Sequence, residues 1–372
     1  MSQVNEIRRL KALDRQIVEI ATWLSPAKLL NPTMPSRRRA WEAFRLAFRR
    51  GRVIDPFFEY LPLPREDMAR TARAVRALDL GDTEVDAIFR GQIREIELQL
   101  EMLEARGTAR FGEVTAELYG LPDAEIQALA RGILCGTVEL ESAPDIDDDK
   151  GERLNAWAMA DAMRDALGRM EIEGWKVVVL GEMSARMSVS ARHKEVRIKS
   201  DSAFSLPDRD RLIVHELGTH VQRACNGFAT GLLNLGLGLP GYMATEEGLA
   251  SWMEQKHGLL RRSMTIIYAY RALGAHLAHH HSFADTFQGL LDVGASPEIA
   301  WDVTLRVKRG LTDTSRLGGN PKDFVYLQGH LLVTRFLKEG GSEEDLFMGK
   351  VAIDQIPMVK SILSRWDFKA ND

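Results

Sequence analysis

Residues 211–220 read Arg-Leu-Ile-Val-His-Glu-Leu-Gly-Thr-His, which places histidines at positions 215 and 220 and a glutamate at position 216. Imidazole and carboxylate are a common ligand set for catalytic zinc. In a regular α-helix, five residues rotate the side chain through roughly 500°, so His215 and His220 would point about 140° apart and could not share an ion. Both rings return to one face if the helix contains an i→i+5 bulge. We therefore predict such a bulge, and we expect Gly218 to tolerate the distortion.

A third ligand is expected from a helix that follows. Residues 245–252 read Thr-Glu-Glu-Gly-Leu-Ala-Ser-Trp, in which Thr245 can cap a helix and two acids lie in the first turn. The alternative interpretation is that both acids only complement the helix dipole. We favour Glu247 over Glu246 as the ligand. With His215 and His220 it would complete a site for one zinc ion per chain.

Together the two segments resemble the signature of the QEGLA-motif proteins, often described as flavohaemoglobin expression-modulating, whose animal relatives include the microtubule-associated tyrosine carboxypeptidases. The signature joins a HExxxH motif of the form His-Glu-x-Gly-Thr-His to Gln/Glu-Glu-Gly-Leu-Ala, and here Glu246 stands at the first position of the second motif. Further matching segments lie at residues 31–32, 56–60, 306–310 and 322–327. The resemblance implies that the two histidines and Glu247 bind zinc and that Glu216 is the general base.

The same resemblance implies a zinc metallopeptidase, in particular a carboxypeptidase that removes C-terminal residues from a peptide or protein. Such an enzyme must hold the terminal carboxylate of its substrate. Three cations of the matching segments are candidates for this contact, namely Arg306, Arg309 and Lys322. Tyr326, or an arginine, is a candidate donor to the oxyanion that forms on attack.

Two other functions stay open. A zinc endopeptidase or amidase would use the same metal chemistry with an open groove and no carboxylate contact. A regulatory binding protein with a structural metal is the other, but structural zinc usually has four ligands and is rich in cysteine.

Composition excludes several classes of protein. The chain has 372 residues, of which 45% are hydrophobic and 27% charged, and this is typical of a globular protein with one large or two medium cores. A net charge of -4 argues against nucleic acid or an anionic membrane as a partner. The weakly polar run at residues 229–244 is broken by glycines and Pro240, so we expect no transmembrane helix. Two cysteines and a start without a signal-like pattern favour the cytoplasm.

The periodicity of apolar residues predicts an α+β protein that is mostly α-helical. Residues 1–143 form a predicted N-terminal helical region, and residues 150–372 a zincin-like catalytic domain. Between them, Asp145 to Lys150 is a polar linker, because a calcium loop would need glycine and glutamate where Lys150 and Ala156 stand.

Strand patterns at residues 175–180, 185–190 and 194–199 predict a small antiparallel sheet just before the zinc helix. This order is similar to that of zincin-type metallopeptidases, in which the edge strand pairs with an extended peptide substrate. The alternative is that the sheet only supports the helix.

Two charged clusters are more easily explained by structure than by binding. The first is basic and lies at Arg37 to Arg39 with Arg45, Arg49 and Arg50, and we favour a solvated helix face over an acidic partner. The second contains histidines at positions 276, 279, 280 and 281, and we favour a polar helix end over a second metal site.

Overall fold

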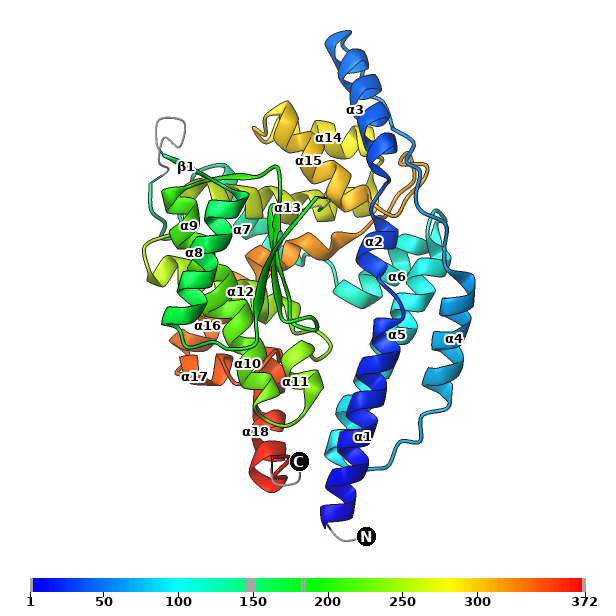
Figure 1. Ribbon diagram of the computed structural model, residues 1–372. Coiled ribbons are helices and arrows are strands. Elements are labelled where there is room, and N and C mark those ends of the chain that lie inside the picture. The colour runs from blue at the N-terminus through cyan, green and yellow to red at the C-terminus, as the bar shows by residue number, and fades with distance from the viewer. Residues whose placement is uncertain (1–2, 145–151, 182, 184, 370–372) are drawn as a thin grey trace. The chain divides into compact units, whose positions relative to one another are not determined.

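The computed structural model describes residues 3–144, 152–181, 183 and 185–369. It has small sheets and is mostly α-helical, so the predicted α+β class is confirmed (Figure 1). No helix within these ranges is long and apolar enough to cross a membrane.

The chain divides into two compact units, each assembled from separate segments. Unit 1 consists of residues 1–11, 141–264 and 329–372, and unit 2 of residues 12–140 and 265–328. The sequence predicts two domains that divide around residues 143–150. Whether the two sides fold independently is not decided by these units, so the domain division stays a prediction. Most of the polar linker expected there, Asp145 to Lys150, lies outside the described residues.

Unit 1 contains two small sheets. In the first, β1 (Arg153–Asn155) pairs antiparallel with β5 (Ala203–Ser205). The second has the order β2-β4-β3, formed by β2 (Lys176–Leu180), β3 (Met187–Ser190) and β4 (Glu195–Lys199). The expected three strands are present, but the sheet is mixed, because β2 pairs parallel with β4 while β3 pairs antiparallel with it. Strand β4 has the same direction as β2 and lies between β2 and β3, so it pairs parallel with β2. The prediction of a purely antiparallel sheet was therefore wrong.

Helix α8 (Ala156–Arg169) covers this sheet, and it begins where Asn155 accepts hydrogen bonds from the backbone nitrogens of Trp157 and Ala158. Apolar side chains from α8, β4 and the histidine-containing helix form the core of unit 1. Among its buried members are Met159, Met163, Val196, Ile198, Leu217 and Val221. The helix that contains His215 and His220 is thus packed into this core through Leu217 and Val221.

The remaining helices of unit 1 are short. They are α9 (Leu206–Leu212), η2 (Ile213–Val221), α10 (Gln222–Phe228), α11 (Leu233–Leu237), α12 (Met243–Lys256), α17 (Glu343–Leu346), η4 (Ile353–Gln355) and α18 (Ile356–Arg365). Three other helices contain three of the four points where the chain passes from one unit to the other: α1 (Gln3–Thr22), α13 (Arg262–His280) and α16 (Val325–Lys338). Ser205 caps α9 by accepting a hydrogen bond from the backbone nitrogen of Asp208, as its sequence predicts.

Two glycines mark a close approach of α12 to the unit 1 part of α16. A Cβ atom on Gly248 would lie 2.1 Å from the carbonyl carbon of Gly329, and one on Gly329 would lie 1.9 Å from the carbonyl oxygen of Ala244. Neither position has room for a side chain. The glycine of the Glu-Glu-Gly-Leu-Ala segment therefore serves backbone packing.

Unit 2 is helical. Its helices are α2 (Pro26–Leu30), α3 (Met34–Arg49), α4 (Arg65–Arg76), α5 (Glu84–Ala105), α6 (Arg110–Tyr119), α7 (Ala124–Leu134), α14 (Phe283–Asp292), α15 (Pro297–Lys308) and η3 (Pro321–Phe324). An aromatic cluster forms one core of this unit, with Phe44, Phe58, Phe283, Phe287 and Trp301 as buried members. Phe58 is fully buried in this core, whereas the neighbouring Phe57 is exposed.

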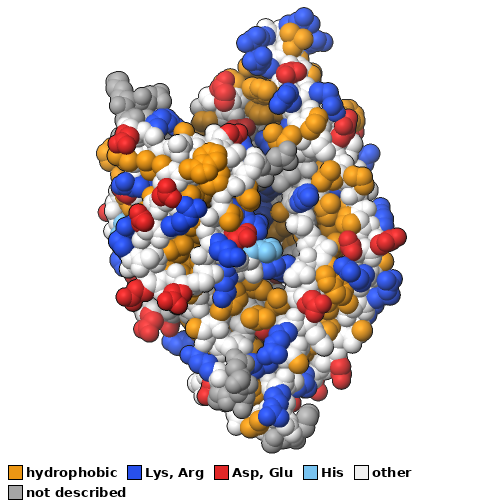
Figure 2. All heavy atoms as spheres, viewed as in Figure 1, with side chains coloured by type: hydrophobic (Ala, Val, Ile, Leu, Met, Phe, Trp, Pro, Cys, Tyr) orange, Lys and Arg blue, Asp and Glu red, His pale blue; other side chains and the backbone are white. Residues whose placement is uncertain are grey.

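The basic side chains of α3 and the residue that follows it point to solvent. Arg38, Arg39, Arg45, Arg49 and Arg50 are exposed, and Lys and Arg side chains gather over the outer end of α3 in Figure 2. Within the described part of the chain, one ion pair involves this cluster and joins Arg39 to Glu59 at 2.7 Å. These five residues are thus solvated, and the preference for a solvated face over an acidic partner stays a prediction.

Candidate metal centre

The segment that carries both histidines is a π-helix, η2, inserted between α9 and α10. The hydroxyl of Thr219 donates a hydrogen bond of 3.2 Å to the carbonyl oxygen of Val214, five residues earlier. The rings of His215 and His220 lie with their centroids 4.8 Å apart. The predicted i→i+5 bulge is confirmed, and it brings the two rings together.

Gly218 is not what permits the bulge. Its φ lies outside the left-handed region, and a Cβ atom there would lie 3.7 Å from the carbonyl oxygen of Ile213, which is an ordinary contact. The expectation that this glycine absorbs the distortion was therefore wrong. An L-residue with a small side chain would fit at this position.

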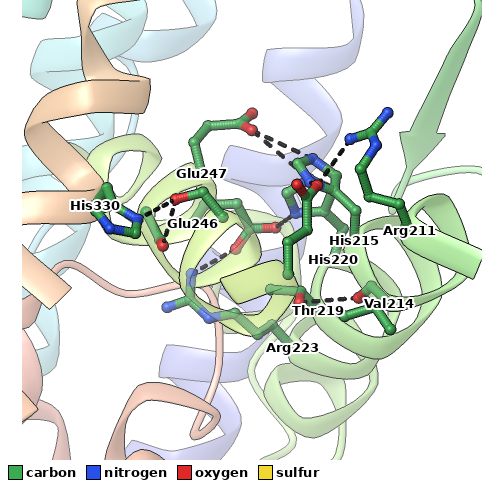
Figure 3. Close-up of polar contacts among 12 residues, drawn as sticks. Arg211, Val214, His215, Thr219, His220, Arg223, Glu246, Glu247 and His330 are labelled. Carbon is green, nitrogen blue, oxygen red and sulfur yellow. Dashed lines mark hydrogen bonds and ion pairs between the residues drawn. The ribbon is translucent and has the colours of Figure 1, made fainter. Parts of the chain in front are cut away.

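Glu247 of α12 faces the Nε2 atoms of both histidines (Figure 3). Its Oε2 lies 3.7 Å from Nε2 of His215 and 3.8 Å from Nε2 of His220. This oxygen is buried and has no hydrogen-bond partner within the described residues. Atoms bound to one zinc ion at about 2.1 Å in a tetrahedral site lie roughly 3.4 Å apart, so the three side chains fit a zinc ion with little movement.

The Nδ1 atoms of the two histidines face two other carboxylates of α12. Nδ1 of His215 lies 2.6 Å from Oε1 of Glu254, and Nδ1 of His220 lies 2.9 Å from Oε1 of Glu246. A carboxylate can only accept, so each ring carries a proton on Nδ1, and Nε2 is the atom left to bind a metal. This is the tautomer that a ligand to a metal at Nε2 requires.

Buried cations stand behind these outer carboxylates. Glu246 accepts hydrogen bonds from Arg223 and Lys350, and Glu254 accepts one of 2.8 Å from Nη1 of Arg211. Burial opposes the ionisation of Glu246, but the charges of Lys350 and Arg223, with the hydrogen bond from His220, hold its pKa well below the usual range. The two neighbouring acids of α12 therefore have different surroundings, since Glu246 is fully paired and Glu247 is not.

His215 is surrounded by carboxylates. Burial alone would lower its pKa, but the hydrogen bond and charge of Glu254, followed by the charges of Glu216 and Glu247, raise the pKa to about 9 when no metal is present. Glu216 itself is buried in η2, directly after His215. The cluster has the negative charge that a divalent cation would neutralise.

The four residues suggested for substrate binding belong to unit 2. Arg306 Nη1 lies 2.8 Å from Oδ2 of Asp323, and Arg309 Nη2 lies 3.1 Å from Oδ1 of the same side chain. Burial opposes the ionisation of Asp323, but the charges of Arg309 and Arg306 keep its pKa well below the usual range. The structure thus joins two of the predicted cations through one buried carboxylate, and leaves the Nε of Arg309 buried without a hydrogen-bond partner in the described chain.

The other two candidates contact aromatic rings. The ring of Tyr326 stacks on that of Tyr268 with centroids 5.2 Å apart, and the guanidinium of Arg271 lies 5.0 Å from the centroid of Tyr326. Nζ of Lys322 lies 5.9 Å from the ring centroid of Tyr119. Arg271 was not among the predicted residues, because it stands in no motif.

The histidine-rich end of α13 forms no comparable site. Ring centroids of His276 and His280 lie 5.2 Å apart, and those of His279 and His280 lie 4.9 Å apart. In the described parts of the chain, the one group of three or more possible ligands with atoms close enough for a metal is His215, His220 and Glu247. The preference for a polar helix end over a second metal site stays a prediction.

Comparison with known proteins gives a consistent result. The family model described as "Microtubule-associated tyrosine carboxypeptidase" matches residues 48–366. The mouse protein named Microtubule-associated tyrosine carboxypeptidase 1 is 32% identical over 155 residues, which are 40% of this chain and 32% of the mouse protein. Its human counterpart is 32% identical over 151 residues, 39% of this chain and 31% of the human protein. The matched part spans about a third of the length of these relatives.

Proposed function

Because the chain belongs to the microtubule-associated tyrosine carboxypeptidase family, we propose that it is a zinc-dependent carboxypeptidase with a zincin-like catalytic core. The observation that carries the zinc part of the proposal is the buried, unpartnered Oε2 of Glu247, opposite the Nε2 atoms of His215 and His220. The names of the relatives support the carboxypeptidase part. The narrower resemblance to QEGLA-motif proteins stays a prediction.

In this proposal, His215, His220 and Glu247 are the zinc ligands. Zinc held by three protein ligands supplies a Lewis acid and lowers the pKa of water that it binds. The hydrogen bonds that Glu254 and Glu246 accept from Nδ1 hold both rings in the orientation and tautomer needed. One zinc ion per chain is the expected stoichiometry.

Glu216 is the proposed general base. It follows the proposed ligand His215 in the chain and is buried. Its carboxylate would take a proton from the attacking water, and because of the burial this would happen in a site with little solvent. The same carboxyl group would then deliver that proton to the amine that leaves. Burial strengthens each of these electrostatic interactions.

Arg306, Arg309 and Lys322 are the proposed contacts for the terminal carboxylate of the substrate. Arg306 and Arg309 place two positive charges around the one buried carboxylate of Asp323, so this pair carries an excess positive charge that suits a second carboxylate. Tyr326 is the proposed donor to the oxyanion. Of these assignments, that of Arg309 has the most specific support, because its buried Nε lacks a partner in the part of the chain described.

A zinc endopeptidase or amidase is the second candidate, and one observation favours it. Among the described residues, strand β3 pairs with β4 alone and packs beside η2, so its other edge could pair with an extended peptide. A peptide bound in this way could run past the metal and be cut internally.

A cytoplasmic location, and the absence of nucleic-acid and membrane partners, stay predictions from the sequence.

Digestion of a peptide library, with the cut positions mapped by mass spectrometry, tests the proposal. Peptides that end in tyrosine should be included because the relatives are named tyrosine carboxypeptidases. We expect loss of C-terminal residues that stops when a chelator removes the metal and returns when zinc is restored. Cleavage that is indifferent to chelation, in protein shown to be metal-free, would contradict the zinc mechanism.

A further inference from the structure

Glu254 is fully buried at the far end of α12 from Glu247, and its interactions are concentrated on one oxygen. Oε1 accepts both from Nδ1 of His215, at 2.6 Å, and from Nη1 of Arg211, at 2.8 Å. Oε2 is buried and has no hydrogen-bond partner within the described residues. A buried carboxylate is costly unless it is paired, and here the imidazole and the guanidinium meet at the same atom.

This arrangement holds the His215 ring from two sides. Glu254 lies at Nδ1, and Glu247 Oε2 lies 3.7 Å from Nε2. Rotation of the ring about its Cβ–Cγ bond would break the short contact with Glu254. The ring is therefore fixed with its Nε2 atom directed toward Glu247.

Arg211 in turn fixes Glu254. It lies four residues before His215, on α9, and its Nη2 is 3.8 Å from Oδ1 of the buried Asp208. The guanidinium is thus located by two carboxylates rather than by Glu254 alone. Arg211, Glu254 and His215 form a continuous chain of charged contacts inside unit 1.

The equivalent carboxylate at His220 has a different balance of charge. Glu246 is contacted by two cations, Arg223 and Lys350, which use both of its oxygens. Glu254 is paired with Arg211 and also with His215, and its second oxygen has no hydrogen-bond partner among the described residues. Less of the charge on Glu254 is neutralised, so more of it acts on the His215 ring.

We propose that Glu254, located by Arg211, is a positioning residue for the metal ligand His215. This inference rests on the proposed zinc site, since it concerns how one of its ligands is oriented. Outer carboxylates of this kind fix the tautomer and raise the donor strength of a ligating imidazole.

Three variants test the proposal by metal binding instead of peptidase activity. Glu254→Gln removes the charge and keeps the length of the side chain. Glu254→Asp keeps the charge beside Arg211 but is one methylene too short to reach Nδ1 of His215 without movement. Glu343→Gln is the matched control, because Glu343 pairs with Lys256 at the exposed end of α12.

The readouts are the zinc dissociation constant, from competition with a chelator, and the visible absorption spectrum of the cobalt(II)-substituted protein. We expect Glu254→Gln and Glu254→Asp each to weaken zinc binding about 10- to 100-fold and to shift the cobalt spectrum. Glu343→Gln should leave both at the wild-type value. The unfolding midpoint of each metal-free variant shows whether it is folded, and Glu254→Asp remains the test if Glu254→Gln does not fold.

Two results would overturn the proposal. Wild-type zinc affinity and cobalt spectrum in a folded Glu254→Asp variant would mean that Glu254 only neutralises Arg211. A wild-type protein that binds no zinc would overturn this inference and the proposed function together. Zinc binding without peptidase activity would remove the proposed function alone, because neither readout here depends on catalysis.

Discussion

Oε2 of Glu247 lies 3.8 Å from Nε2 of His220, whereas the preceding residue, Glu246, contacts Nδ1 of the same ring at 2.9 Å. Consecutive residues of one helix thus face opposite nitrogens of one imidazole. In the proposed zinc site, Glu247 is therefore the ligand and Glu246 the outer partner that holds the ring.

This difference predicts opposite effects for two identical substitutions. Glu247→Gln should weaken zinc retention and change the stability of the metal-free protein little, because the lost oxygen has no partner among the described residues. Glu246→Gln should lower the free energy of unfolding by about 3 to 5 kcal/mol, because it leaves Arg223 and Lys350 buried beside a neutral amide. Urea denaturation of the metal-free variants and zinc analysis measure both quantities. If Glu246→Gln lost zinc with unchanged stability while Glu247→Gln kept it, the two assignments would be exchanged.

Glu216→Gln separates binding from chemistry. The amide has the size of the carboxylate but cannot accept a proton, so we expect zinc content to persist while kcat falls by about 10²- to 10⁴-fold. The measurement is kcat on any cleaved peptide with the zinc content of the same sample. Unchanged turnover in a zinc-loaded variant would exclude Glu216 as the base.

His330 should make the fold less stable in acid. The ring is buried, with Nδ1 2.9 Å from the hydroxyl of Ser251, and burial lowers its pKa to about 4, against a smaller opposing effect of Glu254. Between pH 4 and 6.5, His330 therefore binds more protons in the unfolded chain than in the folded protein. The stability that the neutral His330 ring contributes is complete above pH 6.5 and is lost as the pH falls toward 4.

The predicted loss is up to about 3 kcal/mol between pH 7 and pH 4. His330→Gln should flatten that part of the pH profile of the unfolding free energy. His193→Gln, at an exposed histidine, is the matched control and should keep the wild-type slope. Equal slopes in the wild type and His330→Gln would show that His330 does not titrate in this window.

Gly248→Ala tests the approach of α12 to α16. The added methyl group would lie 2.1 Å from the backbone of Gly329, so the helices must separate, and we expect a loss of at least about 1 to 3 kcal/mol of stability. Gly168→Ala is the control, because that helical position has open space around it, and alanine there should be neutral or stabilising. Thermal unfolding of both variants decides the matter, and a stable Gly248→Ala would refute the close approach.

The site was predictable where local spacing determines geometry. A spacing of five positions from His215 to His220 requires a bulge if both are ligands, and the π-helix provides it. The sequence did not predict the roles of Glu254, Arg223 and Lys350. A charged residue outside a motif does not show which distant residue it will pair with, and Lys350 lies 104 residues from Glu246. The parallel pairing of β2 with β4 was missed for a similar reason, since period-two patterns predict strands but give no order.

The most direct test of a zinc carboxypeptidase compares one cleaved peptide with its C-terminally amidated form, each incubated with the zinc-loaded protein and with Glu216→Gln. Amidation removes a charge-assisted contact to the terminal carboxylate and leaves a cation unpaired, which should slow cleavage by roughly 10- to 100-fold or more. The account predicts that the wild-type protein shortens the free-acid peptide from its C-terminus, that the amidated peptide is nearly untouched, and that Glu216→Gln cuts neither. Equal cleavage of both peptides at the same internal bond would contradict the carboxypeptidase assignment.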